Sequence, residues 1–399
     1  MTSKCNLQLI LTTFLLLVSG MVLADVPAGS AGDPGQETPG SGLEIAKEEK
    51  VEESKEAADR FRFLPIPIFV TEPAVGKGLG VALAVFHPVK GGSGDLPPAT
   101  TPTSITQLDN EQEAPPVVSA AFGAYTDSKT WMAGVGHFNN WRQDSIRYAG
   151  ALAAARINSD FYVLGLPVAY SMEGGLLYQD VKFRLGRSKF FLGTSLSYLD
   201  ADNSFGLGDE DLVPQYLLDL EIKNVGLALQ GTYETRDNIM DPNKGQLIEL
   251  NIWRYDEAIG GNYDYWSTKL KALSFHQPHE KFTLGLRLEV SGIDGRPPFF
   301  GYPWVKLRGI PAMRYQDKIA GAIEVEGRYL LAPKWQVLAF GGRGFTSDDV
   351  PFFENPDSIY NYGFGARFNV FESHNVWAGI DVARGPEDWN WYIQVGHPW

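Results

Sequence analysis

Apolar and polar residues alternate with a period of two along most of this chain, and the last segment shows the pattern clearly. One face of that segment is mostly apolar, and the other is more polar or small. The apolar face carries Trp391, Ile393, Val395, His397 and Trp399. A strand has this pattern when one face meets lipid and the other faces a polar lumen. Because the pattern recurs back to about residue 61, the sequence predicts an all-β fold, a closed transmembrane β-barrel.

The composition agrees with a barrel, although it would also suit a soluble protein. Hydrophobic residues make up 44% of the 399 residues, and the mean hydropathy is -0.16. Transmembrane barrels have such values because about half of each strand faces the lumen. A soluble β-sandwich could show the same alternation, with its polar face in water. The export signal and the aromatic residue that ends the last strand favour the barrel.

The first 24 residues have the features of a secretory signal peptide. Lys4 supplies positive charge, residues 7–18 are largely apolar, and Ala24 ends a compact cleavage sequence. We therefore expect export and a location in a bacterial outer membrane. The only cysteine, Cys5, lies within the signal, so the mature chain has no thiol with which to form a disulfide.

Residues 25–60 form an acidic leader. The first part is rich in Gly, Pro and Ala, which predicts disorder, and residues 44–60 form a charged run that suits a short solvated helix. The predicted organisation is therefore a signal peptide over 1–24, a disordered periplasmic leader over 25–60, and a barrel over 61–399.

The barrel region predicts sixteen strands. An even number places both ends of the barrel on the periplasmic side, so residues 301–318 become an extracellular connection and residues 237–245 a periplasmic turn. The long segment 90–115 fits this count poorly, because periplasmic turns are usually short. The predicted strands are 63–71, 78–87, 116–126, 130–140, 145–158, 169–186, 189–200, 223–236, 245–256, 263–276, 282–293, 319–330, 335–346, 360–370, 376–384 and 389–397.

The connection at 301–318 has an unusual composition for an exposed loop. It places Arg308 and Gly309 among apolar and aromatic residues, so we expect it to fold inward and pack. In the next strand, alternation places Glu324 and Glu326 on the lumen face, where Arg308 could form a forked ion pair with either. Whether this pair serves a conformational step or only pins the loop stays open. The predicted lumenal latch consists of Leu307, Arg308, Gly309, Ile310, Glu324 and Glu326.

These residues resemble motifs of a known superfamily. The barrel resembles that of the BamA-type assembly factors, the two-partner-secretion transporters and the bacterial surface antigen family. Their sixth extracellular loop carries a V-R-G-F/Y-like motif that enters the lumen, here Leu307-Arg308-Gly309-Ile310. Their next strand often carries E-x-R, here Glu326-Gly327-Arg328. The resemblance covers about residues 61–399 and implies the short branch that lacks POTRA domains.

Two further motifs bear on this resemblance. The family's F-x-D-x-G reads Phe340-Gly341-Gly342-Arg343-Gly344 here, so an acidic partner for Arg308 is missing at Gly342. That departure makes Glu324 or Glu326 the expected partner. Arg236-Asp237, followed by Asp241 to Gly245, resembles the family's R-D-x-x-x-x-P-x-K-G turn.

No enzyme motif stands out, and we expect neither catalysis nor a cofactor. His276 and His279 flank a Gln-Pro pair and offer too few ligands for a metal site. Residues 76–80 look superficially like a phosphate loop but are better read as a bend into a strand. The net charge of -14 and the lack of a basic run argue against nucleic-acid partners.

The resemblance implies an accessory role in the insertion or transport of membrane proteins or lipids. In that role the first and last strands would pair weakly at a seam that opens toward lipid. The expected seam residues are Pro65 and Pro67, which lack ladder donors, together with Trp391 and Trp399. Expected partners are outer-membrane lipids and other outer-membrane or periplasmic assembly proteins. A passive channel or a structural envelope protein is the alternative.

Overall fold

The fold is described from a computed structural model. The description covers residues 62–70, 76–87, 117–142, 144–163, 166–206, 219–238, 241–311, 313–347, 358–371, 376–395 and 399. The predicted signal peptide, the predicted leader and the segment 90–115 lie outside these residues.

The described residues form one sheet of sixteen antiparallel strands and two short 3-10 helices. Each strand is hydrogen-bonded to the next along the chain, from β1 to β16. The strands are β1 (Arg62–Val70), β2 (Gly78–Phe86), β3 (Val118–Thr126), β4 (Trp131–Trp141), β5 (Ile146–Val163), β6 (Leu166–Arg184), β7 (Phe190–Gly206), β8 (Asp219–Glu234), β9 (Gly245–Tyr255), β10 (Asp264–His279), β11 (Phe282–Arg296), β12 (Ile319–Ala332), β13 (Trp335–Ser347), β14 (Ile359–Phe371), β15 (Val376–Arg384) and β16 (Trp389–Val395), and the helices are η1 (Glu257–Ile259) and η2 (Phe299–Gly301).

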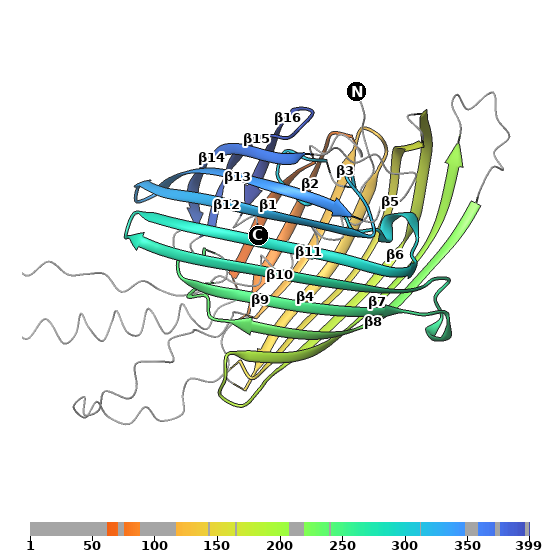
Figure 1. The fold of residues 1–399 in the computed structure, drawn as a ribbon, viewed down its shortest axis with the longest axis horizontal. Coiled ribbons are helices and arrows are strands. Elements are labelled where there is room, and N and C mark those ends of the chain that lie inside the picture. The colour runs from red at the N-terminus through yellow and green to blue at the C-terminus, as the bar shows by residue number, and fades with distance from the viewer. Residues whose placement is uncertain are drawn as a thin grey trace, which may run out of the picture.

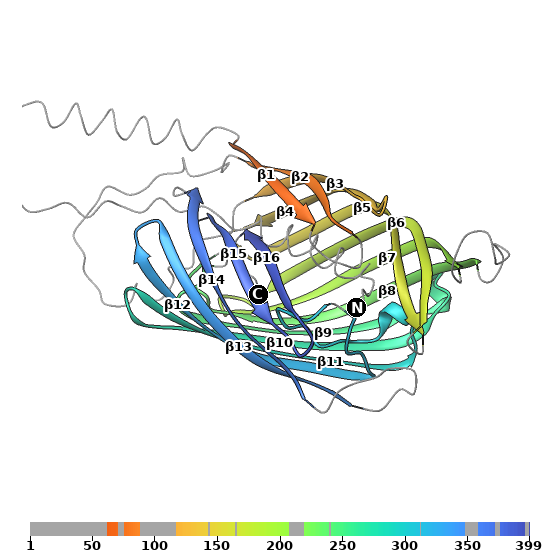
Figure 2. The same ribbon diagram turned by 90° about the horizontal axis from the view of Figure 1, so that it is seen from above.

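The sheet is rolled around a lumen (Figures 1 and 2). All sixteen predicted strands are present, most of them within two residues of the expected bounds. The antiparallel pairing of β1, β2 and β3 confirms the strand count at the point where the sequence left it least certain. The connection at 301–318 joins β11 to β12, and the turn at 237–245 joins β8 to β9, as predicted.

Side-chain exposure follows the predicted alternation. In β11, Leu284 and Leu286 are 41% and 40% exposed on the outer face, whereas Arg287 and Glu289 are buried on the inner face. Charged side chains tolerate such burial only when they are paired. The pattern therefore separates an apolar outer wall from a lumen in which charged groups contact one another.

Strands β5 to β8 are longer than the sequence indicated. The prediction ended the fifth strand at residue 158 and the seventh at 200, but β5 continues to Val163 and β7 to Gly206. Polar residues such as Asn158 and Asp202 lie at or beyond the predicted strand ends. In the structure they stay in register with neighbouring strands, because backbone hydrogen bonding continues past the apolar part of the wall.

The inner face of these extended strands packs against the β11–β12 connection. Phe300, Trp304 and Met313 of the connection form one buried cluster with wall residues that include Ile157 and Met172. Burial of large apolar side chains is the main favourable term in such packing. The connection therefore lies inside the barrel, as its composition predicted.

Trp399 corrects one prediction. It was expected on the apolar face of the last strand and at the seam, but β16 ends at Val395. Trp399 is instead buried in a cluster with Leu247, Leu273 and Phe275 from β9 and β10. Its indole N–H donates to a buried acceptor there, as described below. A buried tryptophan usually has such a partner, so the ring can lie inside the barrel and not on the outer wall.

Candidate functional site: a loop latched inside the lumen

The β11–β12 connection lies in a groove that glycines leave open in β13. A Cβ added at Gly344 would come within 2.3 Å of a Val305 methyl group, and one at Gly342 within 2.9 Å of a Leu307 methyl group. Both apolar residues belong to a buried cluster with Ile310. Because side chains are absent from this part of the strand, the loop can pack closely against it.

The loop turns at Gly309, which adopts a left-handed conformation with φ of +86°. Its backbone N–H donates to the Tyr392 hydroxyl at 3.0 Å, and its carbonyl accepts from the Asn390 amide at 3.0 Å. An added Cβ would also lie 3.0 Å from the Gly385 nitrogen. Glycine is therefore required here by both conformation and space, and the turn is bonded to β16.

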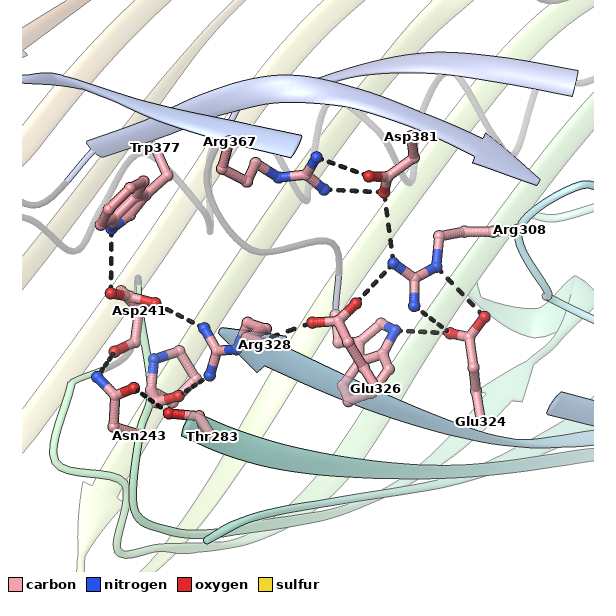
Figure 3. Close-up of polar contacts among 12 residues, drawn as sticks. Asp241, Asn243, Thr283, Arg308, Glu324, Glu326, Arg328, Arg367, Trp377 and Asp381 are labelled. Atoms are coloured by element: carbon pink, nitrogen blue, oxygen red, sulfur yellow. Dashed lines mark hydrogen bonds and ion pairs between the residues drawn. The ribbon is translucent and has the colours of Figure 1, made fainter. Parts of the chain in front are cut away.

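This turn aims Arg308 at carboxylates on the barrel wall (Figure 3). Its Nε and Nη2 contact the two oxygens of Glu324 at 3.3 and 3.2 Å, while Nη1 donates to Glu326 at 2.6 Å. The sequence predicted a forked pair with one of these glutamates, and the structure brings both to the guanidinium. The Phe340 ring lies 3.5 Å from the guanidinium carbon, on its face.

A third carboxylate, Asp381 on β15, was missed by the sequence analysis. It lies 3.3 Å from Arg308 Nη1 and also binds Arg367 through both oxygens, at 2.6 and 2.8 Å. At Gly342, where the related motif has an acid, an added side chain would meet Leu307 and the Asn361 oxygen. Asp381 therefore supplies a carboxylate from two strands away, and alternation on β15 was the signal that could have found it.

The ionic contacts continue from the latch to the opposite end of the barrel. Glu326 lies 3.8 Å from Arg328, and Arg328 donates to Asp241 at 2.6 Å. Asp241 belongs to the β8–β9 turn and also accepts from the Trp377 indole at 3.1 Å. A single chain of polar groups, buried except at the partly exposed Asp241, thus joins the β11–β12 connection to the β8–β9 turn (Figure 3).

Trp399 completes the site. Its indole nitrogen donates to Glu324 at 2.8 Å, and its ring lies 5.6 Å from the Arg308 guanidinium carbon. Asn361 also donates to Glu324, at 2.6 Å. Glu324 is therefore held by three different groups, which fixes the position of the carboxylate that receives Arg308.

The site is almost sealed from water. The side-chain exposure is 8% for Arg308, 1% for Glu324 and Glu326, and 0% for Asp381. Burial lowers the pKa of Arg308, but Glu324, Glu326 and Asp381 outweigh this and raise it above its ordinary value. We call Arg308, Glu324, Glu326 and Asp381 the latch cluster.

The other expected site residues lie elsewhere. Pro65 and Pro67 are exposed in β1, and Trp391 is 53% exposed on the outer face of β16. The weak seam between these strands stays a prediction. In the described part of the chain, no group of three His, Cys, Asp or Glu residues is arranged to hold a metal ion. That part also contains no helix with the length and apolarity needed to cross a membrane.

Comparison with known proteins finds similarity in structure alone. No protein-family model matches the sequence, and neither does any curated protein. BamA from Haemophilus ducreyi lacking POTRA domains 1–3 matches with a TM-score of 0.53 and 8% identity, over 84% of this chain and 69% of that one.

Two CdiB structures match similarly. CdiB from Acinetobacter baumannii has a TM-score of 0.54 and 10% identity, and CdiB from Escherichia coli has 0.55 and 12%. Each match covers 84% of this chain but only 59% and 62% of the respective CdiB chain. At such identities the likeness concerns the fold. The chain therefore has the sixteen-stranded barrel fold found in BamA and CdiB.

Proposed function

We propose that this chain is a bacterial outer-membrane barrel that assists the insertion or transport of membrane proteins or lipids, with the β11–β12 connection as a latched plug. One observation carries the proposal: a loop is held inside the lumen by a buried ion cluster that draws on β12 and β15. A loop latched in this way would restrict free diffusion through the barrel. Outer-membrane lipids and periplasmic or outer-membrane assembly proteins are the proposed partners.

The barrel fold shared with BamA and CdiB supports this class of function. The L-R-G-I and E-x-R residues also supply the latch, so the motifs that resemble the superfamily meet in one place. We propose that the latch keeps the loop inserted at rest and that a partner or cargo displaces it.

Single-channel conductance of the refolded barrel tests the plug. We expect wild type to be silent and a variant lacking residues 301–318 to conduct, because the loop occupies much of the lumen. Steady conductance by wild type would overturn the plug and make a passive channel the leading function. The water-accessible charges on the β6–β11 wall, described below, are the observation that favours that alternative.

Assisted insertion needs a second assay. Wild-type barrel in liposomes should speed the folding of a second outer-membrane barrel into the same liposomes, compared with liposomes that hold an unrelated barrel. Equal folding rates in both preparations would contradict the role in insertion while leaving the plug intact.

A further inference from the structure

A second charged region lies in the lumen, beside the latch cluster, because its strand β11 pairs with β12 of the latch. We call it the lysine cluster. It combines side chains of β6, β9, β10 and β11 with one from the β11–β12 connection, and none of them belongs to the latch. Its members are Lys182, Glu249, Lys269, Lys271, Glu289 and Lys306.

The cluster is built around its two carboxylates. Glu249 binds Lys182 at 3.1 Å. Glu289 binds two ammonium groups, Lys269 at 3.2 Å and Lys306 at 3.1 Å. Because Lys306 comes from the inserted loop, these contacts place the cluster on the interior of the barrel.

Lys271 lies between the two carboxylates in the sheet. The register places it directly opposite Glu249 on β9 and Glu289 on β11. Each of these glutamates is already paired with another lysine. The cluster therefore contains four ammonium groups and two carboxylates, an excess of two positive charges.

Neighbouring groups do not remove this excess. The nearby carboxylate of Asp180 already accepts from Ser195 at 2.9 Å and from Gln230 at 2.6 Å. On the other side, Arg287 adds a positive charge next to Glu289 and donates to the Lys306 carbonyl. These two neighbours add one charge of each sign, and Arg236, which also lies near Lys271, is paired with Glu234 at 2.7 Å. The local balance is therefore unchanged, although the whole chain carries a net charge of -14.

Water reaches these side chains, unlike those of the latch cluster. Exposure is 18% for Lys182, 31% for Lys269 and 22% for Lys306. They face the lumen, so the accessible space beside them lies inside the barrel. An excess of ammonium charge in such a space attracts and retains anions, because walls of low dielectric focus the field.

We propose that the lysine cluster binds a multiply charged, phosphate-bearing anion in the lumen. Ammonium groups are compact charges with three donors each, and lysine is a common phosphate ligand for this reason. A phosphate group would accept from Lys269, Lys271 and Lys306 and would balance the excess charge. Because Lys306 is two residues from Arg308, the bound anion would contact the loop that the latch cluster holds.

The support from Lys306 itself is electrostatic. Lys306 and Lys269 both contact the single carboxylate of Glu289, at 3.1 and 3.2 Å. A bound anion would supply the counter-charge that Lys306 now shares with Lys269.

Isothermal titration of the refolded, full-length barrel with inorganic pyrophosphate tests the proposal. We expect binding to wild type and a loss of affinity of about tenfold or more in the double variant Lys269→Gln/Lys271→Gln. The matched control is Lys281→Gln, an exposed lysine in the β10–β11 turn, which should bind as wild type does. Equal affinity in the double variant, or no binding of pyrophosphate by wild type, would overturn the site.

Two arms make the experiment decisive. Micelles containing phosphatidylglycerol, compared with uncharged detergent alone, show whether the phosphate of a lipid headgroup competes with pyrophosphate. If the double variant does not fold, Lys269→Arg/Lys271→Arg keeps the charge and should retain binding within about threefold. If the folded arginine variant lost pyrophosphate binding completely, the positive charge of these side chains would not be what binds the anion. None of these outcomes depends on the proposed role in insertion or transport.

Discussion

The latch cluster and the lysine cluster are two charged regions of one lumen, but they are built differently. In the latch cluster Arg308 meets three carboxylates, Arg367 shares one of them, and the exposed fractions do not exceed 8%. In the lysine cluster the ammonium groups outnumber the carboxylates, and three of the lysine side chains are 18–31% exposed. Sealed and mutually paired charges hold a segment in place, whereas hydrated charges in excess attract a ligand.

This contrast predicts very different costs for removing a charge. Taking one partner from a buried ion cluster leaves the others unpaired in a medium of low dielectric. When one charged side chain is removed from a hydrated cluster, water can solvate the charges that remain. The following variants test the contrast, from the largest expected effect to the smallest.

Arg308→Ala should have the largest effect. It leaves Glu324, Glu326 and Asp381 buried without their shared cation, which should cost about 3–5 kcal/mol of unfolding free energy. On semi-native gels, the folded band of this variant should disappear at a lower temperature than that of wild type. Arg156→Ala is the matched control, because its ion pair with Glu173 is about half exposed and should contribute less than about 1 kcal/mol. If both variants melt like wild type, the latch has no role in holding the loop.

Gly344→Val tests the groove in β13 without changing any charge. The new side chain would take the space of the Val305 methyl groups, and overpacking of this kind costs about 1–3 kcal/mol. We expect earlier melting and faster proteolysis of the loop. Gly231→Val serves as the control, because a Cβ there meets nothing within 4 Å. Equal proteolysis of the two variants would show that the loop does not depend on the groove.

Trp399→Phe removes one hydrogen bond and keeps an aromatic ring. The indole donor to Glu324 is lost, and a bond of this kind contributes about 0.5–1.5 kcal/mol, or more when the acceptor is charged. Urea titration of the folded barrel should show a small fall in midpoint. An unchanged midpoint would mean that Trp399 packs near the latch without supporting it.

Lys271→Gln should have the smallest effect on stability. Glu249 keeps Lys182 and Glu289 keeps Lys269 and Lys306, and water can solvate the site. The expected change in unfolding free energy is below about 1 kcal/mol, measured by the same urea titration. A loss as large as that of Arg308→Ala would remove the distinction between the two clusters.

Much of this architecture was readable from the sequence. Alternation predicted the face on which Glu324, Glu326 and Arg328 lie, and the composition of 301–318 predicted an inserted loop. The strands β5 to β8 were underestimated because polar residues at their ends look like loop residues. The third carboxylate was also missed, because alternation could place Asp381 on the lumen face but nothing local pairs it with Arg308, 73 positions away.

The sequence by itself determined the strands, their inner and outer faces, and the inward path of the loop, because side-chain alternation follows from the local geometry of an extended backbone. Only the tertiary structure decided which groups meet across the lumen. Arg328 reaches Asp241, 87 positions away, and Trp399 reaches Glu324, 75 positions away. These contacts depend on how the rolled sheet and the inserted loop bring distant strands within reach of a side chain, and no local pattern encodes that distance.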